Sequence, residues 1–422
     1  MTDHQDVGDN ATVLIIGSGS TGLALAQGLL KAGVKCIVFE KDASQTAKSR
    51  DWNMGLHWGA APLEAVLSAE GWSKLQTVQV DPNVPAKPND TLHFLNSQTG
   101  EVMGGATVDL FYRLRRSKLR ALLAEGLDVR YGKRFKDADF SDYEQTVTAY
   151  FEDGSSAVGR MLVGADGSRS SVRRALIPDN FENQRLSYAA TFVQASFTRE
   201  QAQFLRQFHP LYLAGIHPVG QFSFFGIQDA SDETRPETWI FFFYISWPSS
   251  LEEQDATEDW SDAQRLQQLK DFAKDYADPW KSALEWVPQD HPVWYLRLSD
   301  WDPGAEGHQW DNQRGRATLV GDAAHTMTYQ RGQGLNHSIT DAAKLTDALK
   351  LFMVNTSNDV SAGAESGDVH LQEESINAFE VEMIARGGAE VRMSTTNTKM
   401  LHDWESALRS PVMTKGMHRE KK

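Results

Sequence analysis

The chain has 422 residues and a mass of 47.1 kDa, a length typical of two or three domains. Hydrophobic residues make up 41% and charged residues 23%, so the chain can bury a sizeable core and does not have the composition of a disordered protein. The 42 lysines and arginines against 57 aspartates and glutamates leave a net charge of −15. That balance disfavours nucleic acid or an anionic membrane surface as the main partner.

The single cysteine, Cys36, excludes an intramolecular disulfide and a cysteine-clustered zinc or iron–sulfur site, and we expect no bound metal. The first ten residues are polar and acidic, without the pattern of a signal peptide. No apolar run approaches the ~20 residues that span a bilayer. We therefore expect a globular protein of the cytoplasm.

The first predicted elements form a strand–helix–strand unit. Residues 12–16 (TVLII) form a continuous apolar, β-branched run typical of a strand buried on both faces. A glycine-rich turn follows, then a helix over 23–33 that stops at its final glycine, and a second buried strand over 36–39.

The glycine-rich turn has the spacing of a dinucleotide-binding fingerprint. Gly17, Gly19 and Gly22 lie between strand and helix, and Glu40 follows 23 residues after the first glycine (40 − 17). The first glycine permits the tight turn, the second lets backbone approach a pyrophosphate, and the third lets helix and strand pack closely. Glu40 would accept hydrogen bonds from a ribose. The predicted site also includes Ser20, Thr21 and Lys41. This unit suits NAD or FAD; the alternative is a tight turn with a solvated Glu40.

The middle of the chain alternates between short helices and strands. Residues 42–110 are mixed, and a short helix begins at Arg116. Strands are expected near 128–131, 144–151 and 160–163.

The texture changes after residue 185, where aromatic residues predict an inserted sheet with strands at 222–225 and 239–247. A last buried strand at 317–320 leads into a helix over 333–349. The expected domains are a first part of a cofactor-binding domain (11–184), an inserted substrate-binding sheet domain (185–300), a second part of the cofactor-binding domain (301–350), and a mobile loop over 355–367 with a closing helix from 371 (351–422).

Two further segments resemble a known family. Residues 164–173 (GADGSRSSVR) resemble the GADGxxSxVR motif of flavoprotein aromatic hydroxylases. Residues 319–325 (LVGDAAH) and 331–336 (RGQGLN) resemble their GDAAH…GxGxN motif. With the fingerprint, the motifs occur in the family's order. The chain resembles the single-component FAD-dependent monooxygenases of the para-hydroxybenzoate and salicylate hydroxylase type, especially fungal members of secondary metabolism.

The expected fold is α/β (α+β): a Rossmann-type FAD-binding domain with an inserted β-sheet substrate domain and C-terminal helices. By the resemblance, Gly321 and Asp322 would hold the ribityl chain of FAD or a pyrophosphate-bound water, and Asp322 as a helix cap is the alternative. Gly332 and Gly334 would leave backbone N–H groups bare at the start of a helix, near the flavin pyrimidine edge. Leu335 and Asn336 would lie at that edge through their backbone atoms.

Further cofactor contacts follow from the same resemblance. Asp166 would sit near the pyrophosphate, with a turn-forming role as the alternative. Arg116 matches the family's R-x-x-L position and would neutralise pyrophosphate, although Arg115 and Arg113 are close in sequence. Arg50 and Gly55 would cover the adenosine and the flavin edge, or belong to a solvated loop.

One departure from the family concerns Tyr329, which stands where the family often has proline, so the loop beside the flavin is expected to differ. Tyr329 could present a polar tip to the substrate. We interpret His325 as a buried structural histidine.

The substrate side is predicted from the aromatic segment at 239–247. Alternation places Phe241 and Phe243 on one face and Phe242 and Tyr244 on the other, which suits a sheet that covers an apolar pocket, or an ordinary sheet core. The candidates for orienting a substrate are Tyr212, Tyr244 and Arg206, with His57 and Trp58 as further pocket residues.

The function that the resemblance implies is FAD-dependent monooxygenation. NAD(P)H would bind transiently, because the chain shows no second glycine fingerprint, and O2 would react at the flavin as a C4a-hydroperoxide. One oxygen atom would enter an aromatic or electron-rich metabolite, alkaloid-like or polyketide-like, by hydroxylation or epoxidation. Two alternatives share the cofactor motifs: an FAD-dependent oxidase or cyclase without oxygen insertion, and a non-catalytic FAD-fold carrier. The sequence leaves the oligomeric state open.

Overall fold

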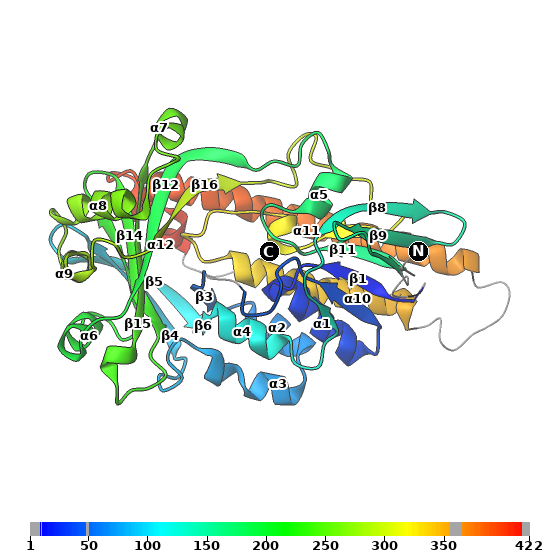
Figure 1. Ribbon diagram of the computed structural model, residues 1–422, viewed down its shortest axis with the longest axis horizontal. Helices are drawn as coiled ribbons and strands as arrows, with labels where there is room; N and C mark the ends of the chain where they lie inside the picture. The colour runs from blue at the N-terminus through cyan, green and yellow to red at the C-terminus, as the bar shows by residue number, and fades with distance from the viewer. Residues whose placement is uncertain (1–8, 10, 48–49, 355–364, 416–422) are drawn as a thin grey trace.

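The computed structural model describes residue 9 and residues 11–47, 50–354 and 365–415. One end of the molecule contains a five-stranded parallel sheet in the order β17-β11-β1-β2-β7 (Figure 1). The predicted first strand is its central strand, with every residue buried. The strands are β1 (Val13–Ile16), β2 (Cys36–Phe39), β7 (Val129–Arg130), β11 (Met161–Gly164) and β17 (Ala317–Leu319).

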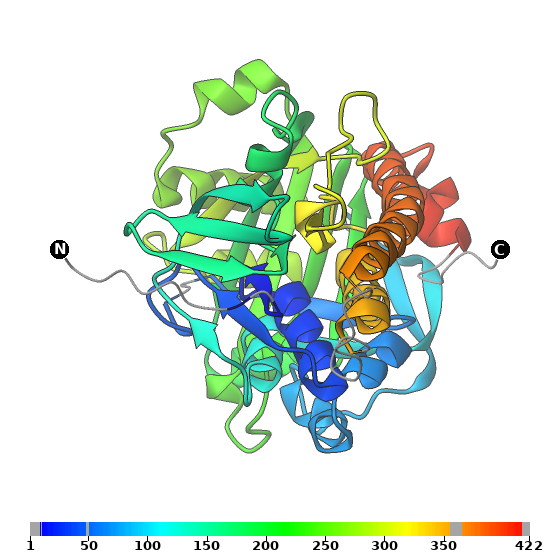
Figure 2. The ribbon, with the colours of Figure 1, turned by 90° about the vertical axis from the view of Figure 1, so that its right-hand side faces the viewer.

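Both faces of this sheet are covered. Helices α1 (Ser20–Ala32), α4 (Arg116–Leu123) and α10 (Gly334–Met353) pack together, and α1 and α10 lie side by side in Figure 2. The other layer is a three-stranded antiparallel sheet whose strands contact β1 and β11. Its strands are β8 (Phe135–Ser141), β9 (Thr146–Phe151) and β10 (Ser156–Gly159). Smaller elements are α2 (Ala60–Val66), α3 (Ala69–Ser73), α5 (Ser171–Leu176) and the pair β3 (Asn53–Leu56) and β6 (Tyr112–Arg115).

The opposite end is a seven-stranded sheet in the order β16-β12-β15-β14-β13-β4-β5, antiparallel except for β13 with β4. Its strands are β4 (Pro88–Asn96), β5 (Val102–Leu110), β12 (Gln184–Ala195), β13 (Tyr212–His217), β14 (Gln221–Asp229), β15 (Ile240–Pro248) and β16 (Val293–Asp300). Its helices are α6 (Arg199–Arg206), α7 (Leu251–Ala256), α8 (Asp262–Ala273) and α9 (Trp280–Trp286). Each of the two large sheets has its own hydrophobic core.

The second sheet draws on more of the chain than we expected. We predicted this sheet within 185–300, but β4 and β5 at 88–110 are two of its seven strands. Strand pairing between segments more than 100 residues apart leaves no local signal, so a boundary drawn from composition misses it.

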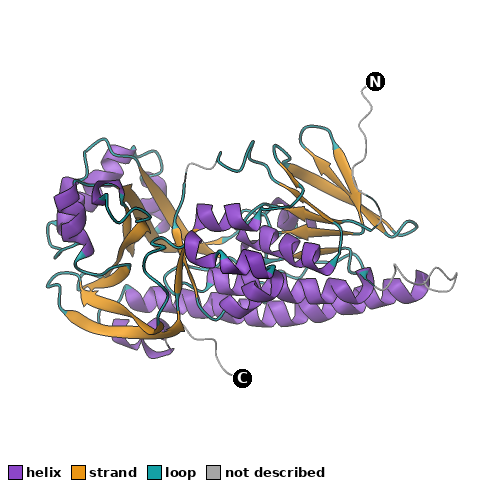
Figure 3. Cartoon of the chain, turned by 90° about the horizontal axis from the view of Figure 1, so that it is seen from below, coloured by secondary structure: helices purple, strands orange, loops and turns teal. Residues whose placement is uncertain are grey.

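A long C-terminal helix, α11 (Glu365–Leu401), extends from the end with the parallel sheet to the end with the seven-stranded sheet (Figure 3). Near its start Gln372 accepts a hydrogen bond from Arg160, and near its end His402 contacts Ser246 of β15. Of the loop predicted at 355–367, residues 355–364 lie outside the described residues, and 365–367 belong to this helix. The short helix α12 (Pro411–Lys415) packs on β5.

Candidate active site

The glycine turn has the geometry that the fingerprint requires. Gly17 has a φ of +109°, and a Cβ there would come within 2.5 Å of the carbonyl oxygen of Ala165. A Cβ on Gly22 would overlap the carbonyl oxygen of Gly17, which closes the helix onto the strand. At Gly19 the nearest protein atom would be 3.9 Å away. The open side of the turn is therefore at the glycine that faces the N-terminus of α1, where an anionic pyrophosphate is favoured.

The three sequence motifs converge on this turn. The amide of Ala165, in the GADG segment, donates to the carbonyl of Ile16 at 2.8 Å. The GDAA segment lies against the first turn of α1, since a Cβ on Gly321 would come within 2.6 Å of the Thr21 hydroxyl. Segments about 150 residues apart in the sequence thus line one place at the carboxyl ends of parallel strands, where α/β proteins bind ligands.

Glu40 is buried at the end of β2 and holds the turn in place. Its carboxylate accepts hydrogen bonds from the Ser18 amide at 3.0 Å and the Ser18 hydroxyl at 2.6 Å. Arg120 of α4, which our sequence analysis did not single out, donates to the carbonyl of Ser18 at 2.9 Å. The sequence could have indicated Arg120, because it lies one helical turn after Arg116 and so on the same face of the helix. Lys41, next to Glu40, is exposed.

The three neighbouring arginines of β6 and α4 have different surroundings. Arg115 pairs with Asp51 and Asp229, and the guanidinium of Arg113 lies over the ring of Phe224. Arg116 stacks on Trp52, with 4.3 Å between its guanidinium carbon and the ring centroid. Burial lowers the pKa of Arg116 to about 10, and the opposing effects come from carboxylates that include Glu40 and Asp322. Of the three, Arg116 is therefore the one that faces the predicted dinucleotide site.

Asp322 is exposed to solvent although protein surrounds it, which is the situation of a side chain that lines a recess. Desolvation raises the pKa of this carboxyl above its ordinary value, against the lowering effect of nearby cations that include Arg116 and Arg173. A Cβ on Gly334 would lie 3.9 Å from Asp322 Oδ1, so the carboxylate faces the first turn of α10. Gly332, with a φ of +64°, has no atom within 4 Å of the position a Cβ would take. Backbone at this helix start is thus open to a ligand, and the residues fit a dinucleotide with an extended ring system.

Asn336 does more than contribute backbone. Its side-chain oxygen accepts from the amides of His57 and Gly59, both at 3.0 Å, and its amide donates to the carbonyl of Gly55 at 3.1 Å. Asn336 is fully buried and joins α10 to the chain after β3. Gly55 and His57 therefore lie next to the helix start, whereas Arg50 is exposed. Leu335 is half-buried, and the indole of Trp58 donates to the Gln333 side chain at 2.9 Å.

Behind the GDAA segment lies a buried ionic cluster. His325 Nε2 lies 2.6 Å from Asp341 Oδ2, and Arg386 of α11 donates to Asp341 Oδ1 at 2.7 Å. Burial alone would raise the pKa of Asp341, but its interactions with His325 and Arg386 outweigh burial and hold that pKa far below its ordinary value. Asp341 also accepts from the amide of Gly321 at 2.8 Å. His325 is fully buried and hydrogen-bonded, as we predicted, and its structural role remains a prediction.

Ser170 is the N-cap of helix α5, and its hydroxyl accepts from the amide of Arg173. The carboxylate of Asp166 supports this helix start: it accepts from the amide of Ser171 at 2.6 Å and from the hydroxyl of Ser170. Arg173 of the same motif donates to the carbonyl of Ala323 at 2.9 Å, so it ties the GADG segment to the GDAA segment. The expected pyrophosphate contact of Asp166 remains a prediction.

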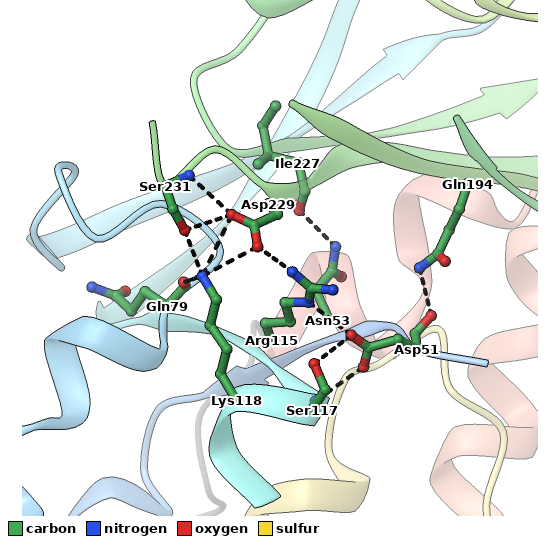
Figure 4. A network of polar contacts seen from close by, with 10 residues as sticks. All are labelled: Asp51, Asn53, Gln79, Arg115, Ser117, Lys118, Gln194, Ile227, Asp229 and Ser231. Carbon is green, nitrogen blue, oxygen red and sulfur yellow. Dashed lines mark hydrogen bonds and ion pairs between the residues drawn. The ribbon is translucent and has the colours of Figure 1, made fainter. Parts of the chain in front are cut away.

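A polar network joins the two ends of the molecule beside this site (Figure 4). Arg115 Nε donates to Asp51 at 2.8 Å and a second guanidinium nitrogen bonds Asp229 at the end of β14. Lys118 lies 3.3 Å from Asp229, and Asn53 donates to the carbonyl of Ile227 at 2.8 Å. The network fixes the seven-stranded sheet relative to the cofactor-side segments.

The face of the seven-stranded sheet toward the cofactor-side residues carries a row of aromatic rings. The rings of Trp294, Phe192, Tyr244 and Phe224 are direct cross-strand neighbours on four adjacent strands. Phe192 stacks on Trp294 with 5.5 Å between ring centroids, and Phe224 stacks on Tyr244 at 5.7 Å. Tyr329, from the loop after GDAAH, lies perpendicular to Tyr244 at 5.2 Å. We call these five residues the aromatic row.

The predicted alternation along β15 holds. Phe241 and Phe243 lie on the opposite face of the sheet, against Phe197 and Phe225. Trp294 and Phe192 of the aromatic row were not expected, because they belong to strands without an aromatic run.

The three residues predicted to orient the substrate lie in different surroundings. Tyr244 belongs to the aromatic row. The hydroxyl of Tyr212 donates to Asp90 at 2.9 Å, and the Tyr212 ring lies against Phe111. Arg206 contacts no ring of the aromatic row: it pairs with buried Asp81 and stacks on Trp239, which lies just before β15.

Comparison with known proteins agrees with this geometry. The family model described as the FAD binding domain matches residues 10–54 and 113–360. The chain therefore belongs to this FAD-binding family, in the class of FAD-dependent monooxygenases, and its cofactor is FAD.

Its relatives include fungal proteins that match over nearly the whole chain. FAD-dependent monooxygenase cctM of Talaromyces islandicus is 36% identical over 414 residues, 97% of each chain. FAD-dependent monooxygenase phnB of Penicillium herquei is 37% identical over 408 residues, 96% of this chain and 94% of the relative. The protein is accordingly an FAD-dependent oxidoreductase.

Solved structures share the fold at low identity. HpxO of Klebsiella pneumoniae, crystallised with FAD and uric acid, superimposes with a TM-score of 0.71 at 17% identity and covers 96% of this chain and 92% of its own. 2,6-Dihydroxypyridine-3-hydroxylase of Arthrobacter nicotinovorans gives 0.70 at 15%, covering 93% of each chain. The described part of the chain contains no group of three His, Cys, Asp or Glu side chains that could hold a metal. In the same part, no helix is both long and apolar enough to cross a bilayer.

Proposed function

We propose that this protein uses NAD(P)H and O2 to insert one oxygen atom into an aromatic or otherwise electron-rich secondary metabolite, by hydroxylation or epoxidation. The observation that carries the proposal is the aromatic row, in which Tyr329, from the loop after the GDAAH motif, contacts the rings of Phe192 and Tyr244. Flat aromatic faces bind flat ring systems by stacking and by burial of apolar surface. The named activity of the fungal relatives supports the same reaction class.

In this proposal the chain's own residues hold FAD along one line. Glu40 accepts from the adenosine ribose, and the amides at Gly19 and Ser20 face the pyrophosphate with Arg116 as its cation. Asp322 accepts from the ribityl chain, and the start of α10 at Gly334 places positive potential at the ring system. Bound FAD supplies the redox chemistry: electrons from NAD(P)H reduce O2, one oxygen atom enters the substrate, and the other leaves as water.

The protein's contribution is position and exclusion of water. The aromatic row supplies an apolar wall, so that a ring bound against it is held in one orientation. The described residues form one parallel sheet with one glycine fingerprint, which supports a nicotinamide that binds transiently.

The experiment is anaerobic stopped-flow absorbance of the purified holoenzyme with NADPH, with and without candidate phenols. We expect the visible flavin band to bleach faster when a substrate is present. Oxygen labelled with a heavy isotope should then appear in a product one oxygen atom heavier than the substrate. A product without added oxygen would favour the oxidase or cyclase alternative, and flavin that is never reduced would favour the carrier.

A further inference from the structure

Arg113 is a charged group without a charged partner beside the aromatic row. Its guanidinium carbon lies 4.8 Å from the centroid of Phe224 and 5.7 Å from that of Tyr212. One terminal nitrogen donates to the side-chain oxygen of Asn53. The Nε atom is shielded from solvent, and no atom of the described residues accepts a hydrogen bond from it.

Arg113 differs from the neighbouring Arg115 in its partners. Arg115, two residues further along, is tied to the carboxylates of Asp51 and Asp229. Arg113 forms no ion pair with any described residue, and Asp90 accepts from the hydroxyl of Tyr212, one of the two rings that the Arg113 guanidinium faces. A guanidinium in the interior usually meets a carboxylate in a two-pronged contact, because an unpaired buried charge is costly.

The surroundings of Arg113 show that its charge is buried without a carboxylate to compensate it. Protein encloses its guanidinium, and burial lowers the pKa of Arg113 to about 10, opposed by Tyr212 and Tyr244 and by no carboxylate. Arg113 and Tyr329 nevertheless keep partial contact with solvent inside this enclosure, as Asp322 does. These are the properties of side chains that line a site which a ligand fills.

The position of Arg113 links the two halves of the site. On β6 it pairs with Gly55 of β3, whose carbonyl is bonded to Asn336 at the start of α10. Its side chain reaches Phe224, a member of the aromatic row. An anion bound to Arg113 would therefore lie between the helix start that faces the FAD ring and the aromatic wall.

We propose that Arg113 binds the anionic group of the substrate, and that the substrate is a planar aromatic anion, either a carboxylate or an ionised phenol. The inference rests on the function proposed above and narrows its substrate class. Asn53 accepts from one terminal nitrogen, and the rings of Phe224 and Tyr212 face the guanidinium. Because Nε is shielded from solvent, the incoming oxygen atoms meet the other terminal nitrogen.

The test measures binding by calorimetry to the FAD-loaded protein with two matched pairs of probes. The first pair is 2-naphthoate and its neutral amide, and the second is 4-nitrophenolate and neutral 4-nitroanisole, at a pH at which the phenol is ionised. We expect each anion that binds to do so more tightly than its neutral partner. The pair with the larger preference distinguishes a carboxylate from a phenolate.

Substitutions connect the preference to Arg113. Arg113→Met should weaken binding of the preferred anion by roughly tenfold to a hundredfold and leave the neutral partner nearly unchanged. Arg113→Lys, which keeps the charge, should retain most of the preference. The matched control is Arg174→Met, because the Arg174 guanidinium also stacks on a ring, Phe181 at 4.7 Å, but on the exposed surface. Flavin content and thermal midpoint verify that each variant is folded.

Two results would overturn the inference: wild-type protein that shows no preference for either anion, and a folded, FAD-loaded Arg113→Met that keeps the wild-type preference. If Arg113→Met fails to bind FAD, the preference for the anion over the neutral probe, measured in Arg113→Lys and in the wild-type protein, tests the inference. Failure of the proposed function is a separate observation, namely a wild-type protein that prefers the anions and yields no oxygenated product with any of the probes or with other aromatic anions.

Discussion

The FAD-binding end and the aromatic end of the site recognise their ligands by different means. At the first, glycines and helix starts expose backbone, and the contacts around Gly17, Gly22 and Gly321 leave no room for a side chain. At the second, the surface is made by the side chains of the aromatic row, four of which stand on strands whose backbone is already paired in the sheet. Single substitutions at the glycines of the cofactor end are therefore poorly tolerated, whereas the rings of the aromatic end can be exchanged for others without disrupting the sheet.

The largest effect should come from the glycine turn, where two substitutions separate folding from binding. Gly22→Ala should destabilise the fold and abolish FAD binding, because the added methyl group overlaps the Gly17 carbonyl. Gly19→Ala should fold normally but bind FAD weakly, because that side of the turn is open in the protein alone. Thermal unfolding and flavin-to-protein absorbance ratios measure the two properties. Equal thermal midpoints for both variants would contradict the distinction.

The next effect concerns the ionic cluster behind the cofactor motifs. Asp341→Asn should reduce the free energy of unfolding by about 3 kcal/mol, because His325 loses its carboxylate partner and Arg386 keeps only Glu382. The pKa of Asp341 is lower in the folded protein than in the unfolded chain. The ionised carboxylate therefore stabilises the fold above the unfolded pKa of about 3.9, and this stabilisation is lost as the pH falls toward the lower folded value.

Thermal midpoints at a series of pH values check this prediction. Wild-type protein should lose stability on acidification below about pH 4, and the variant should lose less over the same range. A variant with an unchanged acid branch would show that other carboxylates dominate there.

A smaller effect is expected at Asp322. Asp322→Ala should weaken FAD binding by roughly tenfold to a hundredfold through loss of charged hydrogen bonds, with little change in thermal stability of the FAD-free protein, since the side chain is exposed. Fluorescence titration of FAD-free protein with FAD gives the affinity, and Asp322→Asn is the matched control of similar size. Stoichiometric flavin retained through purification of the alanine variant would count against this role.

The smallest effect should come from the network between the two ends. Asp229→Asn removes the charge that Arg115 and Lys118 share and should cost about 1–3 kcal/mol of stability. FAD content should stay normal, because the network lies between the sheets and makes no contact with the glycine turn. Loss of FAD in this variant would show that the two ends are more tightly coupled than the comparison suggests.

The sequence by itself determined most of the cofactor end. The strand, glycine turn and helix from residue 12 to 33 are local in the chain, and their periodicity and glycine spacing follow from packing and turn geometry. The helix of Gly334–Met353 and the alternation along β15 were equally readable, because side-chain direction repeats with a fixed period in each element.

Tertiary structure alone decided how distant segments meet. That β4 and β5 join the second sheet and that Arg206 pairs with Asp81 depend on contacts between residues far apart. That Asp166 bonds the start of α5 depends on a choice among equal hydrogen-bond partners. The same applies to the three arginines at 113–116, which differ in what lies opposite them and not in their residue type. A charge acquires its function from its partners, and only the folded chain supplies those partners.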